Sequence, residues 1–286
     1  MYFWKDFMAY RKYFRNWKRV LINVKLHKFP IQVTTRSGNV YSVSDFVDLW
    51  VTCQTQFSSF PKLKLIRSNG WFGDVDAIYK REEYSYLKCK GEIVVDIGAN
   101  IGDSALYFII KGAKMVIAVE PFPANYKILL ENIAQNNLFE KIIPINAMIG
   151  IENREVFLDV DRKITTGTDA KESENGSKID MITLARIVSD YKITGGLLKI
   201  DCEGCEYNAI LNTDNEILKK FKRIQIESHY GYERIVDKLK TASFFVTYSR
   251  PKNITNKSAS YEQMRVSMIK AERNQNTELQ FLGDKQ

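Results

Sequence analysis

The stretch V-V-D-I-G-A-N-I-G-D-S, at residues 94–104, joins an apolar run to a glycine-containing turn and then to a second apolar run. This order predicts a buried strand at 92–97, a nucleotide-binding turn, and a helix at 101–111. Gly98 allows a tight turn, and Gly102 lets the helix approach the sheet, because neither residue carries a Cβ atom. Turns of this kind also bind NAD or FAD, so the turn alone leaves the ligand open.

Strand and helix patterns alternate along the chain after this turn. We expect further strands at 114–120, 141–148, 196–201, 223–228, 244–248 and 264–269, and helices at 123–135, 181–190, 205–212 and 232–241. Such alternation is typical of βαβ units, which give a parallel sheet covered by helices on both faces. An extra strand at 155–160 and a polar surface loop at 161–178 interrupt the pattern.

The regions before and after this α/β domain differ from it in composition. Residues 1–28 hold eight Lys or Arg against one Asp, with aromatic residues at helical spacing, which predicts an amphipathic helix. Its apolar face could dock on the main domain, touch a membrane surface or contact nucleic acid. A hairpin is expected at 31–35 and 40–43. We therefore divide the chain into an extension at 1–85, a catalytic domain at 86–270 and a polar tail at 271–286.

Three residues favour S-adenosylmethionine over a dinucleotide as the ligand. Asn100 stands where a dinucleotide turn needs its middle glycine for close approach to the pyrophosphate. Asp96, at the end of the strand, suits the ammonium end of S-adenosylmethionine better than a phosphate. Glu120 ends the second strand, where a carboxylate can accept hydrogen bonds from a ribose diol. The alternative is that these carboxylates only cap helices.

Four segments together resemble the FkbM family of methyltransferases. They are V-V-D-I-G-A-N-I-G-D-S (94–104), V-I-A-V-E-P-F-P-A-N-Y (116–126), L-L-K-I-D-C-E-G-C-E-Y (197–207) and I-E-S-H (226–229). The resemblance implies an α/β, Rossmann-like class I methyltransferase with a mostly parallel seven-stranded sheet. It also implies transfer of a methyl group from S-adenosylmethionine, most often to a hydroxyl of a sugar, polyketide, glycan or similar small molecule.

The resemblance also assigns the cofactor residues by position. Asp96, Gly98, Asn100 and Gly102 would surround the methionine part, and Glu120 the ribose. Asn146 and Ala147, which follow the third strand, would lie near the adenine.

An alcohol acceptor must lose a proton, so a general base is expected beyond the carboxyl ends of the fourth and fifth strands. His229 is the first candidate because an ordinary imidazole titrates near working pH, although it could equally orient the substrate or serve the structure. Asp201 and Glu203 are further catalytic candidates. Asp201, Glu227 and His229 could instead bind a divalent cation such as Mg²⁺ or Mn²⁺. Lys199 and Glu206 are expected to be structural, the former through a carboxylate partner.

The cysteine spacing and the lack of a signal peptide or membrane-spanning run lead to expectations about the cellular compartment. Cys202 and Cys205 form a C-x-x-C, which we interpret as small residues packing a turn rather than a metal or redox pair. The sequence shows no membrane-spanning run and no signal peptide, so we expect a cytoplasmic protein, with peripheral membrane contact through residues 1–28 left open. The sequence does not indicate an oligomeric state.

Three other function classes remain as alternatives. A nucleic-acid methyltransferase is disfavoured because the chain has neither an N/D-P-P-Y/F motif nor a Pro-Cys nucleophile. An NAD-dependent oxidoreductase is disfavoured by Asn100. A non-catalytic protein that keeps the cofactor fold is compatible with the retained Asp96 and Glu120, because these residues report binding and not turnover.

Overall fold

The computed structural model describes residues 8, 10–38, 40–43, 49, 76–158, 176–254 and 264–273. The chain divides into two compact units, Met1–Lys62 and Leu63–Gln286. Residues 76–87 group with the second unit, because Tyr84 and Leu87 are buried among residues of its core. The boundary expected from the sequence, at residue 85, put residues 76–85 in the extension. Most of the 161–178 loop and the tail beyond residue 273 lie outside the described residues.

The first unit is a small helix-and-hairpin body. Strands β1 (Ile31–Thr34) and β2 (Val40–Val43) pair antiparallel, as the sequence predicted. The single helix expected at the N-terminus is wrong: α2 spans Trp17–Lys25, and a turn at residues 15–16 separates it from the preceding helical turn. The Asn16 side chain causes this break, since it accepts from the Thr34 amide and donates to the Gln32 carbonyl. The described aromatic residues of the stripe pack with the hairpin of the same unit.

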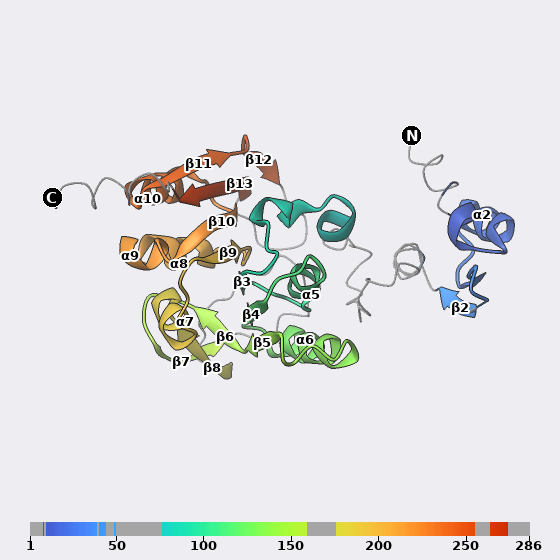
Figure 1. Cartoon of the computed structure of the whole chain (residues 1–286), viewed down its shortest axis with the longest axis horizontal. Helices are drawn as coiled ribbons and strands as arrows, with labels where there is room; N and C mark the ends of the chain where they lie inside the picture. Colours follow the sequence, from blue (N-terminus) through green and yellow to red (C-terminus); the bar gives the residue numbers. More distant parts are fainter. Residues whose placement is uncertain are drawn as a thin grey trace. The chain divides into compact units, whose positions relative to one another are not determined.

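The second unit is built on a twisted central sheet with strand order β11-β13-β10-β9-β3-β4-β5, and the short β12 (Lys252–Ile254) pairs with β13 (Figure 1). Its strands are β3 (Ile93–Ile97), β4 (Met115–Val119), β5 (Ile142–Ile145), β9 (Gly196–Ile200), β10 (Phe221–Ser228), β11 (Phe244–Tyr248) and β13 (Met264–Arg273). Strands β5, β4, β3, β9 and β10 run parallel, and β13 is antiparallel to β10, β11 and β12. The expected seven-stranded, mostly parallel sheet is confirmed.

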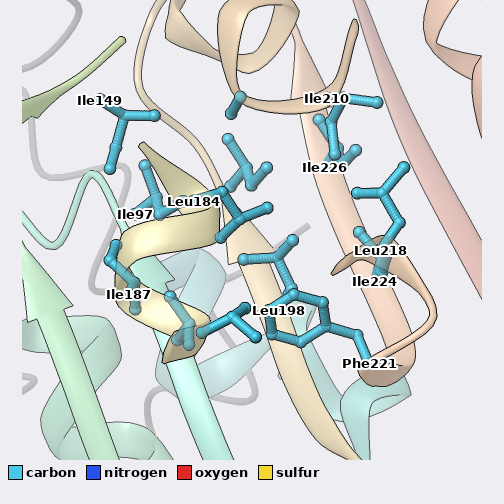
Figure 2. Packing of buried hydrophobic residues seen from close by; sticks show 14 of the residues in the cluster. Ile97, Ile149, Leu184, Ile187, Leu198, Ile210, Leu218, Phe221, Ile224 and Ile226 are labelled. Carbon is cyan, nitrogen blue, oxygen red and sulfur yellow. The ribbon is translucent and has the colours of Figure 1, made fainter. Parts of the chain in front are cut away.

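Helices cover both faces of this sheet (Figure 1). They are α5 (Asp103–Ile110), α6 (Pro123–Gln135), α7 (Leu184–Asp190), α8 (Cys205–Leu211), α9 (Asn215–Leu218) and α10 (Glu233–Thr241), with a 3-10 turn, η2, at Glu83–Leu87 and a π-helical turn, η1, at Asp76–Lys80. Successive strand residues point to opposite faces. Val95 and Ile97 therefore pack with α7–α10 (Figure 2), whereas Val94 packs with α5, α6 and η2.

The strand expected at 141–148 is in fact two strands that belong to different sheets. After β5 the chain turns at Asn146, whose side-chain amide donates to the carbonyls of Glu120 and Pro121. β6 (Ala147–Ile149) then pairs with β8 (Ser177–Ile182), which also pairs with β7 (Arg154–Leu158). β5 lies at the edge of the central sheet, which is where Pro144, lacking an amide hydrogen, is tolerated.

Candidate functional site

Four parallel strands end at the same edge of the sheet, and the candidate residues follow them directly. Gly98 follows β3, Glu120 follows β4, and Asp201 follows β9. His229 follows β10. In open α/β sheets, ligands bind beyond the carboxyl ends of the strands, so this edge is the candidate active site.

The glycine turn is shaped by contacts that a side chain would block. Gly98 has φ +77°, and a Cβ atom there would lie 1.8 Å from the carbonyl oxygen of Asp201. The two loops after β3 and β9 therefore touch through their backbones. Gly102 has φ +87°, and its Cβ would lie 2.5 Å from Leu129 Cδ1. It thus lets α5 approach α6, whereas the sequence analysis had expected it to let the helix approach the sheet.

Asp96 is fully buried and already neutralised. Its Oδ1 lies 3.1 Å from the Lys199 Nζ, and its Oδ2 accepts a 2.6 Å hydrogen bond from Ser104. Burial by itself lowers the pKa of Lys199, but the nearby Asp96 and Asp201 carboxylates outweigh it and raise that pKa. Lys199 also donates to the Gly98 carbonyl at 2.8 Å. The pair therefore holds the glycine turn from beneath, and the expected carboxylate partner of Lys199 is Asp96.

Glu120 links the second strand to the glycine turn. Its carboxylate accepts from the Asn100 amide at 2.9 Å, from the Phe122 amide at 3.1 Å and from Asn125 Nδ2 at 3.2 Å. Burial raises the pKa of Glu120 to about 7, against the lowering effect of these hydrogen bonds. A carboxylate offers about four acceptor positions, so it keeps room for one further donor.

The turn also carries a buried polar atom that lacks a hydrogen-bond partner. Asn100 adopts φ +48°, and its side-chain Oδ1 is buried without a partner within the part of the chain that the structure describes. A buried acceptor of this kind costs free energy unless a ligand or water satisfies it. Together with the two glycines it fits a ligand that places a donor at this turn.

The adenine-side candidates have structural contacts of their own. The Asn146 amide holds the loop after β4, as described above, and Ala147 is buried at the start of β6. The Asn146 amide nitrogen is thus committed to the loop, and the Ala147 side chain offers only a methyl group.

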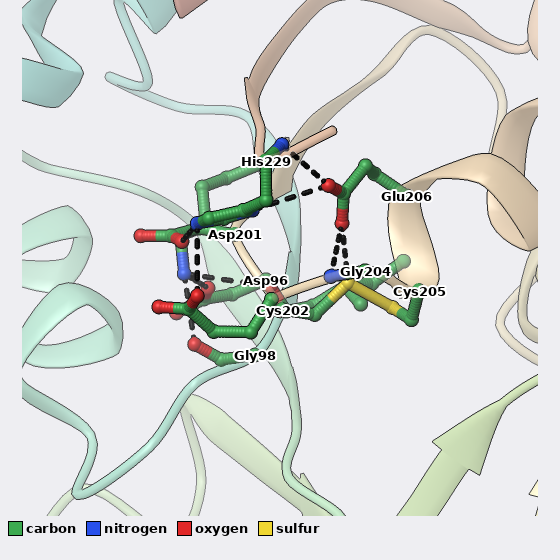
Figure 3. The surroundings of a disulfide bond; sticks show 11 residues. Asp96, Gly98, Asp201, Cys202, Gly204, Cys205, Glu206 and His229 are labelled. Carbon is green, nitrogen blue, oxygen red and sulfur yellow. Dashed lines mark hydrogen bonds and ion pairs between the residues drawn. A yellow bond between two sulfur atoms is a disulfide. The ribbon is translucent and has the colours of Figure 1, made fainter. Parts of the chain in front are cut away.

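On the other side of the turn, carboxylates surround His229 (Figure 3). Its Nδ1 lies 3.1 Å from Glu206 Oε1, and its Nε2 lies 3.2 Å from Glu203 Oε2 and 3.8 Å from Asp201 Oδ1. Its backbone amide also donates to Glu206 Oε1 at 2.8 Å. Glu206, fully buried in the first turn of α8, is therefore more than a helix-capping charge.

The carboxylates change which group can act as a base. Burial would lower the pKa of His229, but Glu206, Glu203 and Asp201 outweigh it and raise the pKa to about 10. His229 therefore lacks, in this environment, the ordinary imidazole pKa that made it the first candidate for the base. Burial and the neighbouring Asp201 carboxylate raise the pKa of Glu227 to about 8.

The fold brings together the three residues that the sequence offered as ligands of a divalent cation. Possible ligand atoms of Asp201, Glu227 and His229 all lie within 4.8 Å of one another. The Asp201 carboxylate is oriented by Tyr84, whose hydroxyl donates to Oδ2 at 3.0 Å.

The interpretation of the two cysteines as simple packing residues is wrong. Cys202 and Cys205 form a disulfide with an S–S distance of 2.08 Å, whereas Cys89 is free and buried. The spacing allowed this bond, but spacing alone could not show that the turn brings the two Cα atoms to 5.5 Å.

A surface hollow lies at the opposite, amino edge of the strands, beside Leu197. Two ion pairs line it, Lys222 with Glu92 and Arg223 with Glu272, together with Lys88 and Arg273. It offers none of the chemistry found at the carboxyl edge, where the four strand ends converge.

Comparison with known proteins agrees with this geometry. The profile of the family described as "Methyltransferase FkbM domain" matches residues 96–271, more than half of the chain. The chain belongs to the FkbM methyltransferase family. It is therefore an S-adenosylmethionine-dependent methyltransferase, and the expected family, fold class and enzyme type are confirmed.

Individual relatives of this FkbM methyltransferase are distant. An uncharacterized protein, 158B, of Sulfolobus islandicus rod-shaped virus 1 is 29% identical over 173 residues, which cover 59% of this chain and 83% of the relative. Precorrin-6y C5,15-methyltransferase from Geobacter metallireducens is 12% identical, with a TM-score of 0.44 over 74% of this chain and 95% of that one.

A second solved structure, a proposed RNA methyltransferase from Pyrococcus horikoshii, is 14% identical. Its TM-score is 0.43 over 76% of this chain and 93% of that one. No helix in the described part of the FkbM methyltransferase is long and apolar enough to cross a membrane.

The sequence did not indicate the contact of Tyr84 with Asp201 or that of Glu206 with His229. Tyr84 precedes the catalytic strands by a short turn and reaches Asp201 across the sheet, 117 residues along the chain. No local motif marks such a residue. Glu206 is the penultimate residue of the third family segment, but its partner His229 lies 23 residues away.

Proposed function

We propose that this FkbM methyltransferase methylates a hydroxyl oxygen of a sugar, glycan or other small molecule. The observation that carries the proposal is the acidic lining of the acceptor side. Asp201 and Glu203 lie there, and the Asp201 charge also acts on Glu83. Such a lining repels the phosphates of a nucleic acid, whose binding depends on cationic contacts. It favours a neutral or cationic acceptor.

The cofactor would be held by the turn after β3 and by Glu120. Gly98 and Gly102 shape the cradle, Asn100 offers its unpaired side-chain oxygen, and Glu120 offers its remaining acceptor position to a ribose hydroxyl. Asn146 and Ala147 would border the adenine through their backbone. Asp96 would support the turn through Lys199 rather than contact the ligand. When bound, S-adenosylmethionine supplies a methyl group activated by its sulfonium sulfur.

Glu227 is our candidate for the general base. A carboxylate whose pKa is near 8 accepts a proton more readily than an ordinary one and matches a working pH near neutrality. It would take the hydroxyl proton as the acceptor oxygen becomes nucleophilic. His229, protonated among its carboxylates, would position Asp201 and Glu203 and offset their charge.

The same donor set supports a second role. Because the ligand atoms of Asp201, Glu227 and His229 lie within 4.8 Å of one another, they could hold a divalent cation that polarises the acceptor hydroxyl. Activity measured with MgCl₂ or MnCl₂ and with a chelator distinguishes the roles. Loss of activity on chelation, restored by the metal, would favour the cation.

The test separates cofactor binding from turnover. S-adenosylhomocysteine binding is measured by calorimetry for the native protein, for Glu227→Gln and for the exposed control Glu140→Gln. Transfer of a labelled methyl group is then screened over sugars, glycans, lipid hydroxyls and RNA. We expect micromolar binding in all three proteins and a rate loss of about 10²-fold or more in Glu227→Gln only.

Three other outcomes would each change one part of this proposal. Salt-dependent methylation of RNA would replace the proposed acceptor class. Binding without transfer to any acceptor would support the non-catalytic alternative. Full activity of Glu227→Gln would reject Glu227 as the base while leaving the methyltransferase assignment intact.

A further inference from the structure

The Cys202–Cys205 disulfide closes a small ring inside the acceptor side of the site (Figure 3). The ring encloses Glu203 and Gly204, which have φ angles of +58° and +132°. Glu203 is thus held in the left-handed region, which L side chains other than Asn or Asp rarely adopt. The cross-link helps to keep the chain in this conformation.

The ring contacts both sides of His229. Glu203 Oε2 lies 3.2 Å from His229 Nε2. The Gly204 amide donates at 2.8 Å to Glu206 Oε2, and the other oxygen of that carboxylate binds the His229 amide and Nδ1. A change in the ring would therefore reach the imidazole through both of its nitrogens.

The ring also borders the cofactor turn. A Cβ atom on Gly98 would lie 3.1 Å from the Cα of Cys202, and still closer to the carbonyl of Asp201. The disulfide thus stands where the cofactor and acceptor sides of the site meet.

We propose that Cys202–Cys205 is a dithiol–disulfide exchange site that controls the acceptor side of this methyltransferase. The oxidised form holds Glu203 against His229, and the reduced form releases it. The partner is a dithiol, either a small molecule or a protein. One of its thiolates attacks a ring sulfur, giving a mixed disulfide and a free cysteine thiolate. Its second thiolate then displaces the other cysteine. The protein gains two electrons and two protons, and the partner becomes a disulfide.

The position of the cysteines suits exchange. Both residues are half-buried where they pack against the core cluster, whereas Cys89 is buried. In reducing compartments, thiol systems keep accessible cysteine pairs in exchange, and disulfides found there are usually catalytic or redox-sensing. The effect on turnover rests on the proposed function, but the effect on His229 does not.

The first experiment uses the full chain, oxidised in air or reduced with dithiothreitol. Alkylation followed by peptide mass analysis gives the state of each cysteine. The imidazole signals are then recorded by NMR at one fixed pH. The chain has only two histidines, so the variant His27→Gln assigns the signal of His229. We expect reduction to shift the His229 signal and leave that of His27 in place.

Matched variants identify the cause of the shift. Cys202→Ser/Cys205→Ser should show the reduced-form signal whether or not dithiothreitol is present, and Cys89→Ala should behave as the native protein. Glu203→Gln should shift the His229 signal in the oxidised protein as well. If the double variant does not fold, the reduced native protein gives the same information. An unchanged His229 signal in fully reduced protein overturns the proposal, as does full labelling of both cysteines before reduction.

Turnover is measured last, with any hydroxyl acceptor that the screen provides. We expect reduction to lower the methylation rate by about tenfold and to change the affinity for S-adenosylhomocysteine by less than about threefold. Equal rates in the two forms overturn the control of activity. If the screen yields no acceptor, the NMR signal of His229 decides whether the cysteine pair is an exchange site.

Discussion

The cofactor side and the acceptor side of this site are built in different ways. On the cofactor side, close backbone contacts set the shape, and the charges of Asp96 and Lys199 cancel within the core. On the acceptor side, several carboxylates share a single imidazole, and the pKa of Glu227 is raised to about 8. In the proposed function, backbone contacts shape the cofactor side, whereas ionisable side chains gather on the acceptor side.

The largest effect is expected where the two sides touch. Gly98→Ala places a methyl group 1.8 Å from the Asp201 carbonyl, so one of the two loops must move. We expect a loss of unfolding free energy of about 4 kcal/mol or more and a fall in S-adenosylhomocysteine affinity of over 100-fold. Chemical denaturation and calorimetry measure both.

Gly91→Ala is the matched control for this substitution. Gly91 has φ +78°, close to that of Gly98, but a Cβ there meets nothing within 4 Å. It should cost only about 1 kcal/mol, which is the penalty of the backbone conformation alone. Equal effects of the two substitutions would mean that the loop contact does not shape the cradle.

The second prediction concerns the buried ion pair. Lys199→Met leaves Asp96 as a buried, unpaired charge, so we expect a loss of about 3–5 kcal/mol of stability. The surface pair of Lys222 and Glu92 has the same chemistry, and Lys222→Met should cost no more than about 1 kcal/mol. Thermal and denaturant unfolding provide the comparison. A small effect of Lys199→Met would show that Asp96 takes up a proton instead.

The third prediction uses pH. Because the pKa of Glu120 is raised from its ordinary 4.5 to about 7, the folded protein binds the extra proton more tightly than the unfolded chain. The associated stability is fully present below about pH 4.5 and is lost as pH rises through about 7, by about 3 kcal/mol. Glu120→Gln should remove this part of the pH dependence.

The measurement is denaturant unfolding at pH 5 and pH 8 for the native protein, Glu120→Gln and the exposed control Glu140→Gln. The control should keep the native pH dependence. If Glu120→Gln also keeps it, then the buried carboxylate titrates normally and its hydrogen bonds outweigh burial.

The contrast between the two sides also explains what the sequence could predict. The sequence predicted the strands that contain Asp96 or precede Glu120, and it predicted the glycine turn between strand and helix. Each of these features lies in one continuous segment, so its pattern follows from local physics. The same segments indicated the family. Glu120 could be placed at a strand end, although its three hydrogen bonds could not be foreseen. The split of the third strand at Asn146 depends on contacts with residues 120 and 121, and periodicity does not record them.

Less of the acceptor side could be predicted, because its residues come from different strands and meet only in the folded sheet. Asp201 and His229 were identified by their positions after strands. Their chemistry was not, since the pKa of His229 depends on Glu203 and Glu206, which the fold brings around it. The disulfide illustrates the same limit: the turn between the two cysteines takes left-handed conformations at Glu203 and Gly204, which the residue spacing did not predict.

The smallest expected effect tests the one side chain of the turn that has an unpaired buried oxygen. Asn100→Gly keeps the backbone amide that donates to Glu120, and glycine accepts φ +48° without strain. It removes only the side-chain amide. Stability should stay the same or rise slightly, because a buried acceptor without a partner is lost. Affinity for S-adenosylhomocysteine should fall by about five- to tenfold, the equivalent of one hydrogen bond of about 1 kcal/mol.

Asn137→Gly is the control, since Asn137 is exposed and also left-handed, with φ +54°. It should change neither stability nor affinity by a measurable amount. An unchanged affinity in Asn100→Gly would show that the Asn100 side chain does not contact the cofactor. The turn after β3 would then bind the cofactor through its backbone alone. The cofactor side would depend on glycines and backbone amides, whereas the acceptor side depends on ionisable side chains.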